Sequence, residues 1–194
     1  MQLNENKPKN KVLLHSCCGI CSAHPIKLLK ELGYDPIAYF FNPNIYPATE
    51  HQKRLESQKK VCAEMDCELI VETYDHELYC EVVSGYEHEP ERGKRCKRCF
   101  ELRLLKTAQK ARELDIKNFT TSITTSPHKD FKVISQIGKH FSGYFKINFL
   151  DIDFKKQDGF LKSNKIAKEL GLYRQDYCGC NLSERLNLDG LIND

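Results

Sequence analysis

No stretch of about 18 consecutive apolar residues occurs in this sequence of 194 residues, so we expect no membrane-spanning helix. The first eleven residues are polar and lack the apolar segment of a secretory signal, which favours a cytoplasmic location. Neither sign of charge dominates, because the formal net charge is +3; this value permits an anionic partner without requiring one. Tryptophan is absent and methionine occurs twice, from which nothing follows about function.

Internal repeats and low-complexity stretches are missing too. A chain of this length buries roughly 70% of its unfolded surface, so it needs no disulfide bonds to fold. We expect a single domain over residues 1–194, with a flexible N-terminus at 1–10 and a C-terminal tail at 181–194. The ten cysteines therefore require another explanation, and in a reducing cytoplasm that explanation is metal binding or catalysis.

The pattern of apolar residues predicts an α/β fold. Strands are expected at residues 11–16, 36–41, 67–71, 118–123 and 144–150. Helices are expected between them, at 22–32, 48–65, 76–84, 94–114, up to about 140, and at 163–170. Such alternation predicts a Rossmann-like, doubly wound parallel sheet, in which ligands bind outside the carboxyl ends of the strands. Residues 17–21 follow the first strand and residues 124–129 follow the fourth, so we expect both to face one crevice.

Seven of the ten cysteines fall into three tight groups, namely Cys17-Cys18-x-x-Cys21, Cys96-x-x-Cys99 and Cys178-Gly179-Cys180. Cys96 and Cys99 lie three residues apart near the start of a predicted basic helix, where the helix dipole and nearby cations favour the thiolate form. Thiolates bind zinc or an iron–sulfur cluster, and spacing alone does not separate the two. The position of the ligands beside the expected substrate crevice favours iron–sulfur chemistry.

Three groups supply more thiolates than one four-ligand site uses. A [4Fe–4S] cluster on Cys17, Cys18, Cys96 and Cys99 leaves Cys21, Cys178 and Cys180 for a second mononuclear iron or a redox-active dithiol. Gly179 permits a close turn between the last two sulfurs. The other cysteines, Cys62, Cys67 and Cys80, stand alone in the sequence and are expected to pack as small buried hydrophobes.

Several motifs together resemble the cobalamin-independent epoxyqueuosine reductase family, QueH. They are His15-Ser16-Cys17-Cys18 with Cys21, Phe41-Asn42-Pro43-Asn44-Ile45, Pro90-Glu91-Arg92-Gly93 leading to Cys96 and Cys99, Phe119 to Ser122 with Ser126-Pro127-His128-Lys129, Asp153-Phe154-Lys155-Lys156, and Leu172 to Cys180. The first motif reads Cys-Cys-Gly-Ile-Cys where the family has Cys-Cys-Ala-Pro-Cys. The cysteines are retained, so the ligand types survive the change.

This resemblance implies an adenine-nucleotide-hydrolase-like (HUP) fold and the last step of queuosine synthesis. In that step the epoxide oxygen of epoxyqueuosine is removed at the wobble position of a tRNA anticodon. Relatives on this fold that use ATP carry a glycine-rich phosphate loop after the first strand, where this chain has cysteines. We therefore expect neither ATP nor cobalamin to be used. An external donor such as a ferredoxin or a flavodoxin-like protein is expected to supply the electrons one at a time.

Further residues receive roles on chemical grounds. His15 and His128 could supply protons, and Cys21, Cys178 and Cys180 could take part in catalysis. Tyr173 and Tyr177 could stack on an anticodon base. Seven basic residues are expected to contact phosphates, namely Arg92, Arg95, Lys97, Arg98, Lys155, Lys156 and Arg174. Two other functions stay open at this stage: a zinc-stabilised RNA-binding module, and a thiol–disulfide oxidoreductase that uses Cys178 and Cys180.

Overall fold

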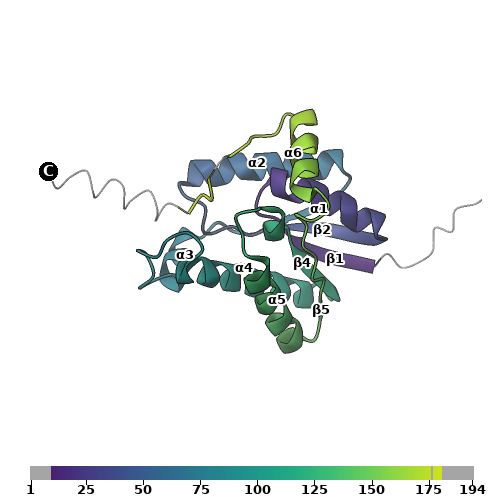
Figure 1. Ribbon diagram of the computed structural model, residues 1–194. Helices are drawn as coiled ribbons and strands as arrows, with labels where there is room; N and C mark the ends of the chain where they lie inside the picture. Colours follow the sequence, from purple (N-terminus) through teal and green to yellow (C-terminus); the bar gives the residue numbers. More distant parts are fainter. Residues whose placement is uncertain (1–9, 176, 181–194) are drawn as a thin grey trace, which may run out of the picture.

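A computed structural model describes residues 10–175 and 177–180 of the chain. The predicted C-terminal tail, and the predicted flexible N-terminus apart from Asn10, lie outside the described residues. Five parallel strands form one sheet in the order β3-β2-β1-β4-β5 (Figure 1). They are β1 (Asn10–His15), β2 (Tyr34–Phe40), β3 (Glu68–Val71), β4 (Asn118–Thr121) and β5 (Asn148–Phe149).

Helices cover both faces of the sheet. On one face lie α1 (Gly19–Glu31), α2 (Ala48–Glu64) and α6 (Gly159–Glu169); on the other lie α3 (His76–Val82), α4 (Lys94–Glu113) and α5 (Phe131–Phe145) (Figure 1). A short 3₁₀ turn, η1 (Ser122–Thr125), follows β4. The two faces have separate apolar cores, because successive side chains of β1 point to opposite sides: Leu13 packs with α4 and α5, and Val12 and Leu14 pack with α1. The predicted doubly wound α/β class is confirmed.

The strand order reverses at β1, which positions the site. The chain runs outward from β1 through β2 to β3, then returns through α4 to β4 on the other side of β1. The segments that leave the carboxyl ends of β1 and β4 therefore diverge at the switch point, where this class of sheet binds ligands. Residues 16–18 and 122–129 occupy that point, as the sequence predicted.

Three predicted boundaries were wrong. The last helix, predicted from Ser163, begins at Gly159, directly after Asp158 in the left-handed conformation. The first helix begins at Gly19 with Cys18 as its N-cap, not at Ser22, because the Cys18 sulfur accepts the Cys21 N–H at 3.5 Å. The strand predicted from residue 144 begins only at Asn148, because α5 continues to Phe145 and ends in the left-handed conformation of Lys146 (φ 56°). Apolar residues at helical spacing extend α5 through residues 144–145, although these residues taken alone are also compatible with a strand.

The polar helix α2 has a buried inner face. Glu50, His51, Arg54 and Gln58 are all buried there together with Leu55. Part of that burial comes from the chain segment around Tyr177 and Cys178, whose carbonyl groups contact Arg54. Buried polar side chains of this kind need hydrogen-bond or ion-pair partners inside the protein. Those of α2 have such partners next to the site described below.

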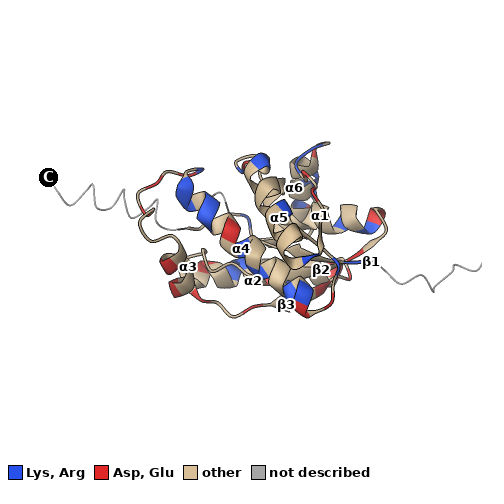
Figure 2. Ribbon diagram, turned by 90° about the horizontal axis from the view of Figure 1, so that it is seen from below, with Lys and Arg blue, Asp and Glu red and all other residues tan. Residues whose placement is uncertain are grey.

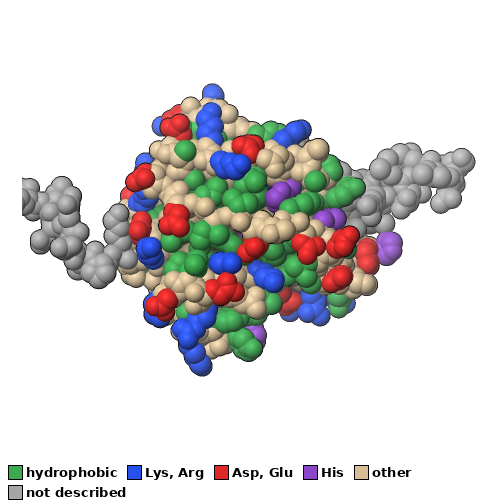
Figure 3. Space-filling view, turned by 180° about the vertical axis from the view of Figure 1, so that it is seen from behind, with side chains coloured by type: hydrophobic (Ala, Val, Ile, Leu, Met, Phe, Trp, Pro, Cys, Tyr) green, Lys and Arg blue, Asp and Glu red, His purple; other side chains and the backbone are tan. Residues whose placement is uncertain are grey.

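Charge is distributed unevenly over the helices. Lys and Arg residues recur along α4, whereas α3 carries Asp and Glu (Figure 2). On the face opposite to the view of Figure 1, acidic and basic side chains are interspersed with apolar ones (Figure 3). Within residues 10–175 and 177–180, no helix has both the length and the apolar character needed to cross a membrane.

Candidate active site and metal centre

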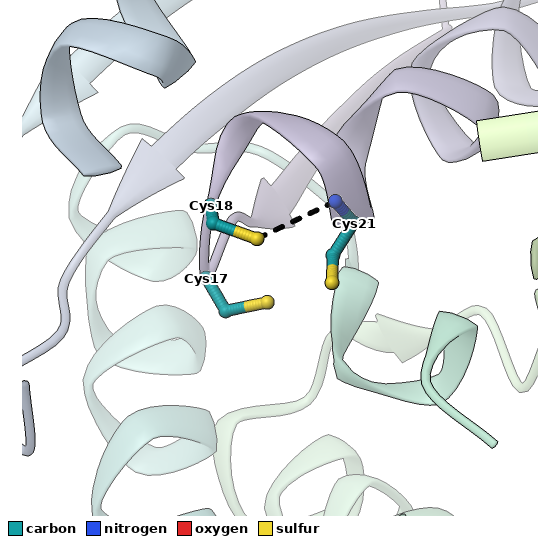
Figure 4. Close-up of side chains that lie close together, drawn as sticks. All are labelled: Cys17, Cys18 and Cys21. Atoms are coloured by element: carbon teal, nitrogen blue, oxygen red, sulfur yellow. Dashed lines mark hydrogen bonds between the residues drawn. The ribbon is translucent and has the colours of Figure 1, made fainter. Parts of the chain in front are cut away.

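The turn after β1 brings three sulfurs together. Cys17 and Cys18 leave the strand, Gly19 starts α1, and Cys21 lies on the first turn of that helix, so the sulfurs of all three cysteines lie within 4.8 Å of one another (Figure 4). A Cβ atom at position 19 would meet the Ser57 carbonyl oxygen of α2 at 2.5 Å, so glycine allows the close approach of α1 and α2. This group is called the thiol triad below.

The three sulfurs of the triad differ in acidity. Hydrogen bonds from the thiols of Cys18 and Cys21, with a further one from Ser122, hold the pKa of Cys17 well below the ordinary thiol value although burial raises it. Donating a hydrogen bond to Cys17 raises the pKa of Cys18 to about 12, and the same cause raises that of Cys21. Cys17 is thus the most acidic sulfur of the triad, and a bound metal ion would displace the protons of the sulfurs that ligate it.

Four further cysteines, Cys96, Cys99, Cys178 and Cys180, lie near one another and are called the thiol quartet below, although no three of their sulfurs lie within 4.8 Å of one another in the described part of the chain. Cys96 and Cys99 lie on α4 and are both 6% exposed, and the Cys96 sulfur accepts the N–H of Arg92 at 3.2 Å. Cys99 and Cys180 pack in the same small buried cluster. Burial raises the pKa of Cys99 to about 11, so the effect of the helix N-terminus does not produce the thiolate expected from the sequence. A metal ion would be needed to remove that proton.

Cys178 has a depressed pKa within the quartet. It accepts a hydrogen bond from the Cys180 thiol, which holds its pKa well below the ordinary value, and the charges of Lys129 and Arg103 act in the same direction. The Lys129 ammonium lies 3.3 Å from its sulfur. Gly179 has φ +90°, and a Cβ there would meet the Arg54 guanidinium at 2.7 Å. The turn between the two sulfurs therefore requires glycine, as predicted.

Arg103 links the two groups. It lies on α4, is 4% exposed, and donates its Nε–H to the Cys99 carbonyl at 3.3 Å. Burial alone would lower the pKa of Arg103, but the negative charges of Cys99, Cys178 and Cys17 raise it. A buried guanidinium close to these sulfurs favours an anionic occupant of the site, such as a thiolate-ligated metal centre. Arg103 follows Cys99 by four residues on the predicted helix. This spacing is the signal in the sequence from which its position beside Cys99 could have been predicted.

The segment from Tyr173 to Cys178 is fastened to α2. Arg54 forms a buried ion pair with Glu50 (Nε–Oε1 2.6 Å) and donates to the carbonyl groups of Cys178 at 3.0 Å and Tyr177 at 3.3 Å. The Tyr173 hydroxyl donates to Glu50 at 2.8 Å. Gln175 reaches the triad, with its Nε2 2.8 Å from the Cys18 sulfur. Nothing in the sequence pairs α2 with this distant segment, so sequence reasoning did not find these interactions.

A cavity of about 460 Å³ opens beside both sulfur groups. Its walls include Cys17, Cys21 and Cys178, together with the cations Arg54, Arg103, Lys129 and Arg174 and the amides Asn42, Asn44, Asn164 and Gln175. Tyr177 and His128 lie at the same cavity. The side-chain oxygens of Asn42 and Asn44 are buried and have no hydrogen-bond partner within the described residues. Each such acceptor costs about 1–3 kcal/mol of stability unless something else supplies the donor.

The two candidate histidines have different surroundings. His15 is completely buried; its Nε2 donates to the Phe41 carbonyl at 3.1 Å and its Nδ1 accepts from the Thr121 hydroxyl at 3.0 Å. Burial lowers the pKa of His15 to about 3, so it is neutral near pH 7 and is not the proton donor we expected. His128 is exposed at the cavity and keeps its place as a candidate.

The seven basic residues that were predicted to contact phosphates have different surroundings. Arg95 is 0% exposed and its Nη1 donates to the Glu87 carbonyl, so its assignment to phosphate is corrected to an internal contact of the loop before α4. Lys97 and Arg98 are exposed on α4, with Arg98 paired to Glu101, and Arg92 is exposed with its Nε on the His128 carbonyl. Lys155, Lys156 and Arg174 lie on the segments that flank the cavity or on its wall.

The remaining cysteine predictions are settled by burial and grouping. Cys62 and Cys67 are buried as predicted and hydrogen-bond to each other, whereas Cys80 is exposed on the charged face of α3 and its predicted burial was wrong. The structure groups Cys21 with Cys17 and Cys18, while the sequence partition placed it outside the cluster ligands. The start of α1 explains this, because Cys18 and Cys21 sit three residues apart on one turn.

Fold and site together define a parallel α/β protein with a cavity lined by thiols and cations at the carboxyl edge of its sheet. A structural relative is described as a predicted subunit of tRNA methyltransferase from Methanocaldococcus jannaschii. It aligns with a TM-score of 0.56 at 13% sequence identity and covers 87% of this chain and 94% of its own. At that identity the likeness supports the fold alone.

Comparison with known sequences identifies the family to which this α/β protein belongs. The profile of the family described as epoxyqueuosine reductase QueH matches residues 12–186. The enzyme of that name from Dehalococcoides mccartyi is 37% identical over 176 residues, which are 90% of this chain and 92% of the relative. The one from Streptococcus pyogenes serotype M1 is 36% identical over 175 residues, 87% of this chain and 68% of the relative. The chain belongs to the epoxyqueuosine reductase QueH family, and the resemblance seen in its motifs is confirmed.

Proposed function

We propose that this enzyme reduces epoxyqueuosine to queuosine at the wobble position of tRNA anticodons. Both carbon–oxygen bonds of the epoxide break, a carbon–carbon double bond forms, and two electrons with two protons release the oxygen as water. The observation that carries the proposal is one cavity lined by three cysteines, Cys17, Cys21 and Cys178, together with the buried Arg103 and the partly buried Lys129. The identity of the substrate is proposed from membership of the QueH family.

The donor set fits an iron–sulfur cofactor. The triad offers three sulfurs within 4.8 Å, and the quartet offers four more cysteines on two segments. Soft thiolate ligands near buried cations suit iron–sulfur clusters, and two sets suit a [4Fe–4S] cluster with a second mononuclear iron. Such iron, when bound, supplies single electrons and a Lewis acid for the departing oxygen. We therefore propose the triad and the quartet as the two sets of ligands. This assignment replaces the one made from the sequence, which placed the cluster on Cys17, Cys18, Cys96 and Cys99.

Residues of the chain orient the substrate and supply protons. The cations Arg103 and Lys129 stabilise negative charge on the oxygen as it leaves, because Arg103 is buried and the Lys129 side chain is only 12% exposed, so both act in an effective dielectric below that of water. His128 is exposed at the cavity, and its imidazole is the candidate proton donor there. Tyr177 is 42% exposed at the cavity wall and offers a ring face to an unpaired base.

The expected partners follow from the reaction. The tRNA would approach over Arg174, which lines the cavity, and over Lys155, whose Nζ donates to the carbonyl of the cavity residue Lys129, with Lys156 next to it in the chain. A ferredoxin or flavodoxin-like protein would deliver the electrons, and neither ATP nor cobalamin would be consumed. A single cytoplasmic domain is sufficient for this chemistry.

One observation favours a dithiol role for part of the quartet. Cys178 has a depressed pKa beside the Cys180 thiol, which is the arrangement from which a dithiol is oxidised to a disulfide. In that second candidate, Cys178 and Cys180 supply the two electrons and the triad alone holds metal.

Mass spectrometry of the digested tRNA tests both versions. Protein purified without oxygen, given epoxyqueuosine-containing tRNA and a low-potential reductant, should yield a nucleoside lighter by one oxygen atom without ATP or cobalamin. Iron-depleted protein should be inactive. No oxygen loss by iron-loaded protein with a competent donor would refute the proposed function. Turnover that is retained in the Cys178→Ser variant would exclude the dithiol version.

A further inference from the structure

The turn at residues 42–45, directly after β2, has a fixed backbone. The Ile45 N–H donates to the Asn42 carbonyl at 3.2 Å and closes the turn. His76 contacts the Pro43 carbonyl at 2.8 Å, and the Tyr74 hydroxyl donates to the Ile45 carbonyl at 2.7 Å. Contacts from the segment 74–76 therefore hold the turn in place, and its side chains are preorganised.

Two residues of this turn line the cavity and have unpaired acceptor oxygens in the described part of the chain. Asn42 and Asn44 are each 2% exposed and line the cavity, and the Oδ1 of each lacks a hydrogen-bond partner within residues 10–175 and 177–180. The orientation of Asn42 is fixed, because its Nδ2 donates to the Ser16 carbonyl at 2.9 Å and a carbonyl only accepts. Its free atom is thus the oxygen. Buried acceptors without donors are rare in folded proteins, and a bound ligand is one explanation for them.

The turn lies between the two sulfur groups. Ser16, which Asn42 contacts, directly precedes the thiol triad. At the other end, the Tyr46 N–H donates at 2.9 Å to the carbonyl of Gly179, which separates Cys178 from Cys180. Whatever part of a substrate reacts at the sulfur groups therefore lies beside these two oxygens.

We infer that Asn42 and Asn44 are specificity-determining residues that accept hydrogen bonds from hydroxyl groups on the epoxide-bearing ring of the substrate. The inference rests on the proposed function and extends it to the part of the substrate that is recognised. Four cations, Arg54, Arg103, Lys129 and Arg174, line the same cavity against a single carboxylate, Glu91, so a neutral hydroxyl donor fits better there than an ammonium group. A site that leaves buried acceptors open discriminates against any ligand that lacks the matching donors.

Binding of two tRNAs that differ in one nucleoside tests the inference. The iron-loaded protein is titrated with tRNA carrying queuosine, the product with its ring hydroxyls, and with the same tRNA carrying guanosine at that position. Wild-type protein should bind the queuosine tRNA more tightly. Asn44→Ala should reduce that preference by about tenfold, while its affinity for the guanosine tRNA stays constant. Asn44→Asp keeps an acceptor oxygen and should retain the preference.

Ser57→Ala is the matched control, because Ser57 also has a buried side-chain oxygen without a partner in the described chain but does not line the cavity. It should bind both tRNAs as the wild type does, and the iron content of all variants should be equal. Equal weakening for both tRNAs, or unchanged preference in Asn44→Ala, would overturn the inference while wild-type turnover continues. Absence of turnover in the wild type would instead refute the proposed function.

Discussion

The buried ion pair between Arg54 and Glu50 should stabilise the protein and also position Cys178. Both side chains are at most 5% exposed and their charged atoms are 2.6 Å apart. Replacing Arg54 with Met keeps an apolar side chain of similar length and leaves Glu50 buried without its cation. Breaking a buried pair in this way costs about 3–5 kcal/mol. For a protein of this size, each kcal/mol shifts the melting temperature by about 2–4 °C, so we expect a decrease of about 6–20 °C.

The same substitution removes the donors to the carbonyl groups of Tyr177 and Cys178. In reduced, metal-free protein, alkylation with iodoacetamide followed by peptide mass spectrometry should show faster labelling of Cys178. Labelling of the buried Cys62 serves as the internal reference. Arg54→Lys keeps the charge but loses the planar fork, so its effect on Cys178 should resemble that of Arg54→Met while its melting temperature falls less.

Lys59→Met provides the control on the same helix. Lys59 pairs with Glu56, but both side chains are about half exposed, and such pairs contribute at most about 1 kcal/mol. If Arg54→Met lowers the melting temperature no more than Lys59→Met does, the buried pair does not stabilise the fold as argued. If the temperature falls but Cys178 labelling is unchanged, Arg54 has a structural role without positioning the cysteine.

The effect of Arg54 should also depend on pH. Burial raises the pKa of Glu50, but hydrogen bonds from Arg54 and Tyr173 outweigh burial and hold it below its ordinary value. A carboxyl whose folded-state pKa is depressed stabilises the fold above its unfolded pKa, about 4.3 for glutamate, and loses that contribution as the pH falls through the folded value. The stability difference between wild type and Arg54→Met should therefore be full at neutral pH and shrink in acid, measured by urea unfolding at several pH values.

The remaining predictions concern the cofactor and the RNA. Protein purified without oxygen should be brown and contain iron and acid-labile sulfide; Cys96→Ala should lose the colour and Cys62→Ala should keep it, and a colourless protein with stoichiometric zinc would contradict this. Joint replacement of Lys155, Lys156 and Arg174 by Ala should weaken tRNA binding, with iron content unchanged. It should also flatten the logarithmic salt dependence of binding by about 0.7–0.9 for each phosphate that the protein no longer neutralises. An unaltered salt slope would show that these residues do not bind phosphate.

The positions of the helices and strands were readable from the sequence to different degrees. The strand before Cys17 and the long helix carrying Cys96 and Cys99 have strong apolar patterns, and both were predicted within a residue or two of their observed ends. The short strand β5 was not, because two residues carry no periodic signal and the helical stripe before them continues to Phe145. The N-cap was missed because a sulfur rather than a hydroxyl accepts the bond.

The sequence by itself determined the class of the fold, the family and the set of seven grouped cysteines, since these depend on local patterns and on motifs that are contiguous in the chain. Tertiary structure decided which sulfurs lie together, that His15 and Arg95 are internal, and that the polar face of α2 holds the segment bearing Cys178. The physical reason is that protonation, burial and hydrogen bonding depend on neighbours far away in sequence. Arg54 and Cys178 are 124 residues apart, and only the folded chain brings them to 3.0 Å.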